Sequence, residues 1–274
     1  MSDELRKRRT SRYFWELTQP EIAAQLKRNP LVILPAGSVE QHGPHLPTGT
    51  DIFAATVISH RVAERMDGLV LPATPLGVTP MHMPFEGTVT LSPDTFMRVV
   101  TETCASVAKH GAKNLVILNW HEGNIPSLAI AADVLHREHG MTVVTVQACY
   151  VAEELYGASC NGLTHGGEIE ALAVLADRPG LVHLERIDDS SDHAHGHRMD
   201  KLRRTRAYQP VLTDIRSIAP TGWFGSPQQA TAEKGVRMLD DIAEKIAGET
   251  SAIFGELDAV QGGPAEVRHL RQVH

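Results

Sequence analysis

Carboxylate and imidazole side chains gather directly after the first apolar run of this 274-residue chain. The run Leu31-Val32-Ile33-Leu34 leads into a loop that carries Glu40 and His42, and Asp51 follows close behind. Carboxylates and imidazoles are the groups that hold zinc and related divalent ions in proteins. The spacing therefore predicts a metal site at the end of a buried strand.

Two further segments place side chains of the same types beside apolar runs. His121 lies in Asn-Trp-His-Glu-Gly-Asn, residues 119–124, immediately after the apolar run 114–118. His165 and Glu168 open a predicted helix. Ligands of open α/β sheets bind at the carboxyl ends of the strands, so we expect the three segments to converge at that edge.

Five side chains are candidate metal ligands: Glu40, His42, Asp51, His121 and Glu168. A catalytic zinc takes about three protein ligands, so Glu40, His42 and Asp51 alone could complete a site for one ion. Five ligands exceed that need, but they suit two ions about 3.5–4 Å apart that share one carboxylate. Asp51, which is set apart from the Glu-x-His pair, is the predicted bridge. A hydroxide held between two such ions is nucleophilic at neutral pH, which predicts hydrolysis of an amide-like bond.

Apolar patterns predict the elements that position these side chains. Strands are predicted over 31–36, 69–71, 114–118 and 142–146, and helices over 52–66, 93–110, 125–139, 165–177 and 227–254. Strands that alternate with helices of this length predict an α/β fold with a mostly parallel central sheet flanked by helices. Because no repeat, low-complexity tract or linker divides the chain, a single domain over 1–274 is expected.

Composition excludes several classes of protein. A formal net charge of -7 disfavours nucleic acid and anionic membranes as partners, because both require a basic surface. Cys104, Cys149 and Cys160 have no C-x-x-C spacing, which predicts reduced thiols and a cytoplasmic protein. Residues 1–12 lack the apolar region of a signal peptide, and no apolar stretch approaches the roughly 20 residues of a membrane helix.

The motif over residues 37–51, Gly-Ser-Val-Glu-Gln-His-Gly-Pro-His-Leu-Pro-x-Gly-Thr-Asp, resembles the signature of the creatininase (creatinine amidohydrolase) family. Further landmarks occur in the family's order: Phe85-x-Gly87-Thr88, Asn-x-His-x-Gly-Asn at 119–124, and His165-Gly166-Gly167-Glu168-x-Glu170. The segment 223–235 is similar to the start of the family's C-terminal helix. The resemblance covers roughly residues 15–254, nearly the whole chain.

The resemblance implies a dinuclear amidohydrolase with a three-layer α/β fold, usually a homohexamer, that holds zinc, manganese or iron. Carried over position by position, it implies five metal ligands: Glu40, His42, Asp51, His121 and Glu168. His165 would match the histidine that passes a proton to the leaving nitrogen. The implied substrate is a small cyclic amide or formamide.

Departures from creatininase proper indicate a member of the wider family. Creatininase proper has a ligating glutamate two residues after the motif histidine, where this chain has Gly123. Glu122 lies one residue earlier and is assigned with His165 to the catalytic group. The glutamate that this chain supplies as Glu168 is lacking in creatininase proper. The tryptophans that shape a creatinine pocket have no clear counterparts among the three tryptophans of this chain, which are Trp15, Trp120 and Trp223.

Four side chains beside the motifs are candidates for contacting the substrate: His82, Thr88, Trp120 and Asn124. Specificity is expected to depend on three loops: 72–93, 150–164 and 181–222. The last loop carries His193, His195 and His197, which resemble a small chelating tract, and their participation stays open.

Other interpretations also stay open. Glu168 could be a first-turn carboxylate that interacts with the helix dipole, and His165 could be structural. His42, His121 and one carboxylate could form the facial triad of a non-haem iron oxygenase. The chain could also be a non-catalytic oligomeric scaffold with a vestigial site. One bound iron and strict oxygen dependence would favour the oxygenase, whereas two ions and oxygen-independent hydrolysis would favour the amidohydrolase.

Overall fold

The structure, a computed structural model, describes residues 11–187, 193–203 and 211–261. The strands are β1 (Leu31–Ala36), β2 (Leu69–Val70), β3 (Asn114–Asn119) and β4 (Thr142–Gln147). The helices are α1 (Gln19–Arg28), α2 (Thr50–Met66), α3 (Pro93–Ala108), α4 (Ile125–His139), α5 (Ala148–Tyr156), α6 (Glu168–Leu175), α7 (Ala194–Arg203) and α8 (Ala232–Gln261). Short 3-10 turns include Pro80–His82 and Glu122–Asn124, both of which border the site described below.

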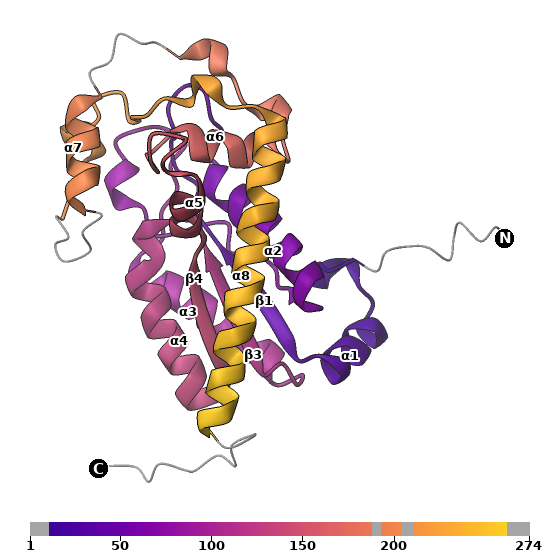
Figure 1. Ribbon diagram of the computed structural model, residues 1–274. Coiled ribbons are helices and arrows are strands. Elements are labelled where there is room, and N and C mark those ends of the chain that lie inside the picture. The colour runs from indigo at the N-terminus through magenta and orange to yellow at the C-terminus, as the bar shows by residue number, and fades with distance from the viewer. Residues whose placement is uncertain (1–10, 188–192, 204–210, 262–274) are drawn as a thin grey trace.

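The strands form one parallel sheet in the order β2-β1-β3-β4, with helices packed around it (Figure 1). Leu115 of β3 lies opposite Val32 of β1 and Val143 of β4. The chain first adds β2 on one side of β1 and then crosses back to add β3 on the other side. Strand order therefore reverses between β1 and β3, and open α/β sheets bind ligands at the carboxyl ends of such a pair.

Alternate side chains of the central strands supply two separate cores. Ile33 and Val116 lie on the face of the sheet that α2, α5, α6 and α8 cover. Val32 and Leu115 lie on the opposite face, which α3 and α4 cover. Every residue of β1 is buried, as expected for a parallel strand with helices on both faces. The α/β class, with a parallel sheet between two helical layers, is confirmed.

The predicted strands and helices are present with shifted ends. The helix expected over 227–254 begins at Ala232 and continues to Gln261, because Pro227 starts a separate 3-10 turn. The helix expected over 165–177 is shorter, and begins only after Gly166 and Gly167.

Three helices are not predicted from the sequence: α1, α5 and α7. α1 is short and buries only Gln25 and Leu26, so few apolar residues mark it in the sequence. α5 lies in the segment that was expected to be a loop; it follows β4 directly, so the apolar pattern shows no break between them. α7 is strongly polar and therefore gives no helical period.

Asp67 connects the start of the described chain to the end of α2. It ends that helix in the left-handed conformation (φ 52°), which Asp adopts more readily than most residues. Its carboxylate lies 2.7 Å from Arg12 and 3.1 Å from Arg28, and its carbonyl accepts a hydrogen bond from Gln25 at 2.6 Å. The guanidinium groups of Arg28 and Arg12 lower the pKa of Asp67 to about 2.

No helix within the described ranges combines the length and the apolar character that a membrane span requires. Cys104, Cys149 and Cys160 are unpaired and buried.

We predict that Asp67→Asn lowers the free energy of unfolding by about 0.5–1 kcal/mol at pH 7, the scale of a partly exposed ion pair. Asn tolerates the left-handed backbone, so the change removes mainly charge. Because folding lowers the pKa of Asp67, its contribution is present above about pH 4 and is lost as the pH falls towards 2. Urea unfolding of both proteins across this range measures the difference, and a difference that stayed constant down to pH 2 would contradict the assignment.

Candidate metal centre

Four of the predicted ligands meet where β1 and β3 end. Glu40 and His42 lie in the loop after β1, Asp51 lies in the first turn of α2, and His121 follows β3 directly. All four are buried. Segments that are far apart in the sequence are therefore brought to the point where strand order reverses, as the strand arrangement requires.

Asp51 lies between two imidazoles. Its Oδ1 is 3.2 Å from His42 Nε2, and its Oδ2 is 3.1 Å from His121 Nδ1. Ser38 Oγ donates a hydrogen bond to Oδ2 at 2.8 Å, and the N-terminal end of α2 favours the negative charge. Each carboxylate oxygen faces a different histidine, as expected for a carboxylate that two ions share.

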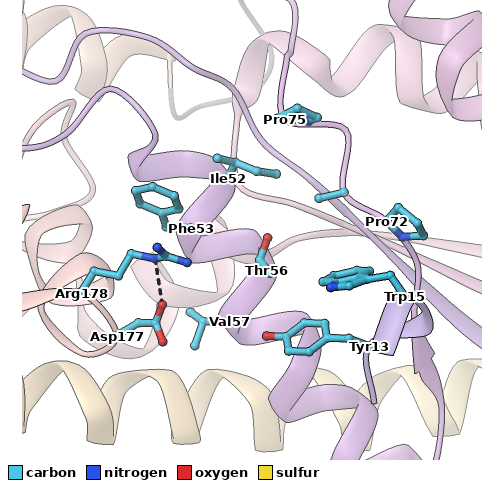
Figure 2. A pocket seen from close by; sticks show the side chains of 11 residues that line it. Tyr13, Trp15, Ile52, Phe53, Thr56, Val57, Pro72, Pro75, Asp177 and Arg178 are labelled. Atoms are coloured by element: carbon cyan, nitrogen blue, oxygen red, sulfur yellow. Dashed lines mark ion pairs between the residues drawn. The ribbon is translucent and has the colours of Figure 1, made fainter. Parts of the chain in front are cut away.

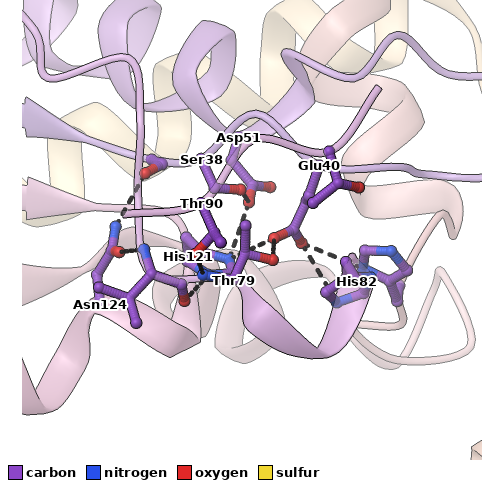
Figure 3. A network of polar contacts seen from close by, with 12 residues as sticks. Ser38, Glu40, Asp51, Thr79, His82, Thr90, His121 and Asn124 are labelled. Atoms are coloured by element: carbon purple, nitrogen blue, oxygen red, sulfur yellow. Dashed lines mark hydrogen bonds and ion pairs between the residues drawn. The ribbon is translucent and has the colours of Figure 1, made fainter. Parts of the chain in front are cut away.

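Glu40 belongs to the same network (Figure 3). Its Oε2 lies 3.3 Å from His121 Nδ1 and accepts a hydrogen bond from Thr79 Oγ1. Its Oε1 lies 3.6 Å from His82 Nε2. Thr79 and His82 come from the connection between β2 and α3, so that loop closes over the Glu40 carboxylate.

Backbone carbonyl groups orient both imidazoles. His42 Nδ1 lies 3.0 Å from the carbonyl oxygen of Glu40, and His121 Nε2 lies 3.0 Å from that of Val78. When these nitrogens donate, the other nitrogen of each ring faces the carboxylates with a lone pair. His42 Nε2 is buried and makes no well-aligned hydrogen bond in the described part of the chain, although Asp51 Oδ1 lies 3.2 Å away. An orphaned nitrogen aimed at carboxylates fits a metal ligand.

Glu170, and not Glu168, faces this cluster. Glu170 Oε2 lies 3.6 Å from His42 Nε2 and accepts a hydrogen bond from the Gly166 amide at 2.6 Å. Glu168 Oε1 instead accepts from Lys234 Nζ of α8 at 2.7 Å. The geometry therefore differs from the expected ligand set, because residues two apart on a helix point in nearly opposite directions. The motif contains Glu170, but no pattern in the sequence favours it over Glu168.

His165 lies against the cluster on the side nearest to solvent. Its ring centroid is 4.4 Å from that of His42 and 4.4 Å from that of His82. Its Nε2 lies 2.7 Å from the Gln41 carbonyl oxygen, and its Nδ1 lies 3.8 Å from Glu40 Oε1. Burial, together with the neighbouring imidazoles His82 and His42, lowers the pKa of His165 well below its usual range.

Charge at the centre favours the binding of cations. Burial alone would lower the pKa of His42, but the carboxylates of Glu170 and Asp51 raise it to about 10. In the same way Glu40 and Asp51 outweigh burial and raise the pKa of His121 to about 9. Burial raises the pKa of Glu170 to about 8. Three buried carboxylates thus stabilise positive charge, whether as protons or as metal ions.

Three overlapping sets of side chains have the separations needed to hold an ion, each with its ligand atoms within 4.8 Å of one another. They are Glu40–Asp51–His121, His42–His165–Glu170 and Glu40–His82–His165. Neither Glu122 nor the tract His193, His195 and His197 belongs to these sets. His193 and His197 lie instead against the rings of Trp223 and Phe224.

The predicted substrate contacts fall into two groups. His82 lies in the cluster beside Glu40, and its contact with substrate stays a prediction. Thr88 Oγ1 accepts from the Gln41 amide at 3.2 Å, so it supports the motif loop. The Asn124 side chain accepts a hydrogen bond from the Val78 amide and donates one to the Gly37 carbonyl. The Trp120 side chain is buried in the core. The last two therefore have structural positions, and a contact with substrate by Trp120 or Asn124 stays a prediction.

The described surface also has an open cavity of about 390 Å³ elsewhere (Figure 2). Tyr13, Trp15 and Phe53 line it, with Asp177 and Arg178 at one end. It contains none of the clustered carboxylates or histidines. The candidate metal centre and this apolar cavity are therefore separate features of the structure.

Comparisons with known proteins identify the family of this chain. The family model described as "Creatininase: Creatinine amidohydrolase" matches residues 15–249. Mycofactocin precursor peptide peptidase of Mycobacterium ulcerans is 30% identical over 244 residues, which span 83% of this chain and 89% of that protein. Creatinine amidohydrolase of Pseudomonas putida is 29% identical over 252 residues, which span 85% of this chain and 93% of that protein.

Solved structures extend the similarity to the fold. A crystal structure of creatinine amidohydrolase (creatininase) has a TM-score of 0.75 and 29% identity, and the match covers 90% of this chain and 98% of that one. A Zn-Zn mutant form and an Mn form of creatininase match with TM-scores of 0.74 and 0.72.

Gly123 explains one departure from the creatininase pattern. A Cβ added there would lie 2.2 Å from the Val78 carbonyl oxygen and 2.6 Å from His121 Nε2. Because that carbonyl orients His121, no side chain fits at position 123 without disturbing the histidine. A glutamate from this position is therefore excluded, and Glu170 lies where a carboxylate can face His42.

We predict that Glu170→Gln changes metal binding, whereas Glu168→Gln changes the stability of the fold. Glu170→Gln removes a carboxylate from the centre and should weaken binding of one divalent ion by about 100-fold or more, beyond the effect of losing an outer-shell partner. Glu168→Gln should leave metal content unchanged and lower the free energy of unfolding by about 1–2 kcal/mol, because it weakens a charge-assisted hydrogen bond to Lys234.

Metal titration and urea unfolding of the two variants separate these effects. Loss of an ion in Glu168→Gln together with full metal content in Glu170→Gln would contradict the geometry.

Proposed function

Because the chain belongs to the creatininase family, we propose that it is an amidohydrolase that holds two divalent ions and cleaves a C–N bond of a small cyclic amide or formamide. The observation that carries the proposal is the position of Asp51, whose two oxygens face two differently held histidines. A single ion would need only one of those oxygens and one histidine with its neighbouring carboxylate.

The donor groups divide into two sets that share Asp51. Glu40 and His121 would hold one ion with Asp51 Oδ2, since their ligand atoms lie together. His42 and Glu170, which form a set with His165, would hold the other, and Asp51 Oδ1, 3.2 Å from His42, would be the shared oxygen. Zinc, manganese and iron all accept imidazole and carboxylate ligands, and the related creatininase structures include Zn-Zn and Mn forms.

When bound, two such ions lower the pKa of a water molecule and polarise a substrate carbonyl. His165 supplies the remaining requirement, a group that moves a proton to the leaving nitrogen. Its Nε2 hydrogen bond to Gln41 leaves Nδ1 directed towards Glu40 and the centre. The low pKa keeps the ring neutral at physiological pH, so Nδ1 can accept a proton and then donate it.

The residues around the centre also exclude bulk water. The clustered carboxylates are almost wholly buried, and the His165 side chain is 14% exposed. His165 therefore lies between the buried carboxylates that would hold the ions and the solvent, where the departing amine would leave. A partly water-free site strengthens the interaction of its charges with the reacting carbonyl.

Two related enzymes differ in the amides their names describe. One acts on a precursor peptide and the other on creatinine, at nearly equal identity to this chain. A peptide amide is therefore the second candidate substrate. The homo-oligomer, hexameric by resemblance, and the assignment of Glu122 as a catalytic residue stay predictions.

We predict that the purified protein contains about two divalent ions per chain and loses its hydrolase activity when a chelator removes them. Adding Zn²⁺ or Mn²⁺ should restore activity, because the ions supply the nucleophile. Metal quantitation paired with a panel of creatinine, lactams, hydantoins, N-formyl compounds and short peptides measures both. The reactions should proceed equally well without oxygen.

One iron per chain together with strict oxygen dependence would contradict the amidohydrolase and support the oxygenase. A well-folded protein that bound no metal and hydrolysed no amide would support the non-catalytic scaffold.

We predict that His165→Asn lowers kcat by about 10²–10⁴-fold, the range expected when a general acid–base is removed. Metal content should remain at the wild-type value, because the proposed ligands are unchanged. His110→Asn, the same change at an exposed histidine in the turn between α3 and β3, is a matched control that should leave kcat unchanged. Loss of an ion in His165→Asn would instead make His165 a ligand.

A further inference from the structure

His45 lies at the end of the Gly-Pro-His segment and has no proposed role in binding metal. It is fully buried, and its Nε2 lies 2.7 Å from the carbonyl oxygen of Gly166. Its Nδ1 is buried without a hydrogen-bond partner in the described ranges. The ring packs edge-on against Trp223, with centroids 4.7 Å apart. Burying an imidazole with one unsatisfied nitrogen is unfavourable. We therefore ask what the hydrogen bond of the other nitrogen, Nε2, contributes to the protein.

Gly166 connects His45 to the metal centre. Its carbonyl accepts from His45, while its amide donates to Glu170 Oε2 at 2.6 Å. Its φ is +76°, a backbone conformation that residues other than glycine rarely adopt. An added Cβ would lie 2.9 Å from Trp223 Cβ and 3.2 Å from the His42 carbonyl oxygen, so the residue is closely enclosed.

These contacts form a continuous chain from His45 to His42. The amide of Gly166 orients the Glu170 carboxylate, whose Oε2 lies 3.6 Å from His42 Nε2. The Gly166 amide shares a peptide group with the His165 carbonyl, which accepts from the Phe224 amide at 2.9 Å. The Gly166 carbonyl belongs to the next peptide group, so His45 holds the glycine from its other side, and a shift of Gly166 would move its amide away from Glu170. The only side chain that fixes the Gly166 carbonyl in the described hydrogen bonds is His45. Orientation of a metal ligand by a hydrogen bond from outside the ligand set typically changes metal affinity by about 10–100-fold.

We propose that His45 is a positioning residue that holds Glu170 on the second metal ion by fixing the backbone of Gly166. The inference rests on the proposed two-ion function. It predicts that the Nε2–H donor of His45, and not merely its volume, determines the affinity for the ion held by His42 and Glu170. The ion held by Glu40 and His121 should be unaffected.

Two variants of similar length separate the donor from the volume. His45→Gln keeps an N–H donor near the position of Nε2, whereas His45→Met fills the space without one. Chelator-treated proteins would be titrated with Mn²⁺ alone, by calorimetry and by electron paramagnetic resonance, which distinguishes coupled pairs from isolated ions. Circular dichroism and thermal unfolding verify that each variant is folded, and His45→Leu replaces the Met variant if that protein does not fold.

Wild-type protein should bind two Mn²⁺ ions as a coupled pair. The Met variant should bind one ion with wild-type affinity and the other about 10–100-fold more weakly, with loss of the coupled signal, and the Gln variant should recover most of the affinity. Equal affinities in Met, Gln and wild-type proteins would overturn the role of His45, as would equal weakening in Met and Gln or weakening of both ions. The role would also be overturned if only the Gln variant folded, because the bond would then serve folding.

Wild-type protein that bound a single Mn²⁺ ion would overturn the two-ion function itself and this inference with it. That outcome appears in the wild-type titration alone, so it is distinguishable from a failure confined to the variants.

Discussion

The Asp51 carboxylate is the point on which the geometry of the centre depends. Its two oxygens face His42 and His121, and these histidines are held by separate backbone carbonyl groups. Ser38 and the N-terminal end of α2 stabilise the negative charge in a buried position. Two histidines from two different strand ends can share one carboxylate only if β1, α2 and β3 are fixed relative to one another.

The parallel sheet provides that constraint. β1 and β3 are neighbours over their whole length, and helical layers cover both faces, so their carboxyl ends cannot separate. The loops at those ends can then carry strongly polar side chains, because the apolar core supplies the stability of the fold. Buried negative charge would be unfavourable here without cations, and the raised pKa values of His42 and His121 show that the carboxylates favour positive charge.

The sequence predicts the α/β class and the segments that converge, because buried strands and amphipathic helices have clear periods. It also predicts the ligand types, since Glu40, His42 and Asp51 stand in one compact motif. It does not distinguish Glu168 from Glu170, because the residues of α6 are buried all round and give no phase to the helix. Nor does it reveal His45, whose contact with Gly166 joins residues 121 positions apart and leaves no local pattern.

Anomalous diffraction from crystals grown with Mn²⁺ tests the two-ion centre most directly. We predict two manganese peaks per chain about 3.5–4 Å apart, with Asp51 between them. Glu40 and His121 should contact one peak, and His42 and Glu170 should contact the other. A single peak, or a pair in which Glu168 replaces Glu170, would contradict it.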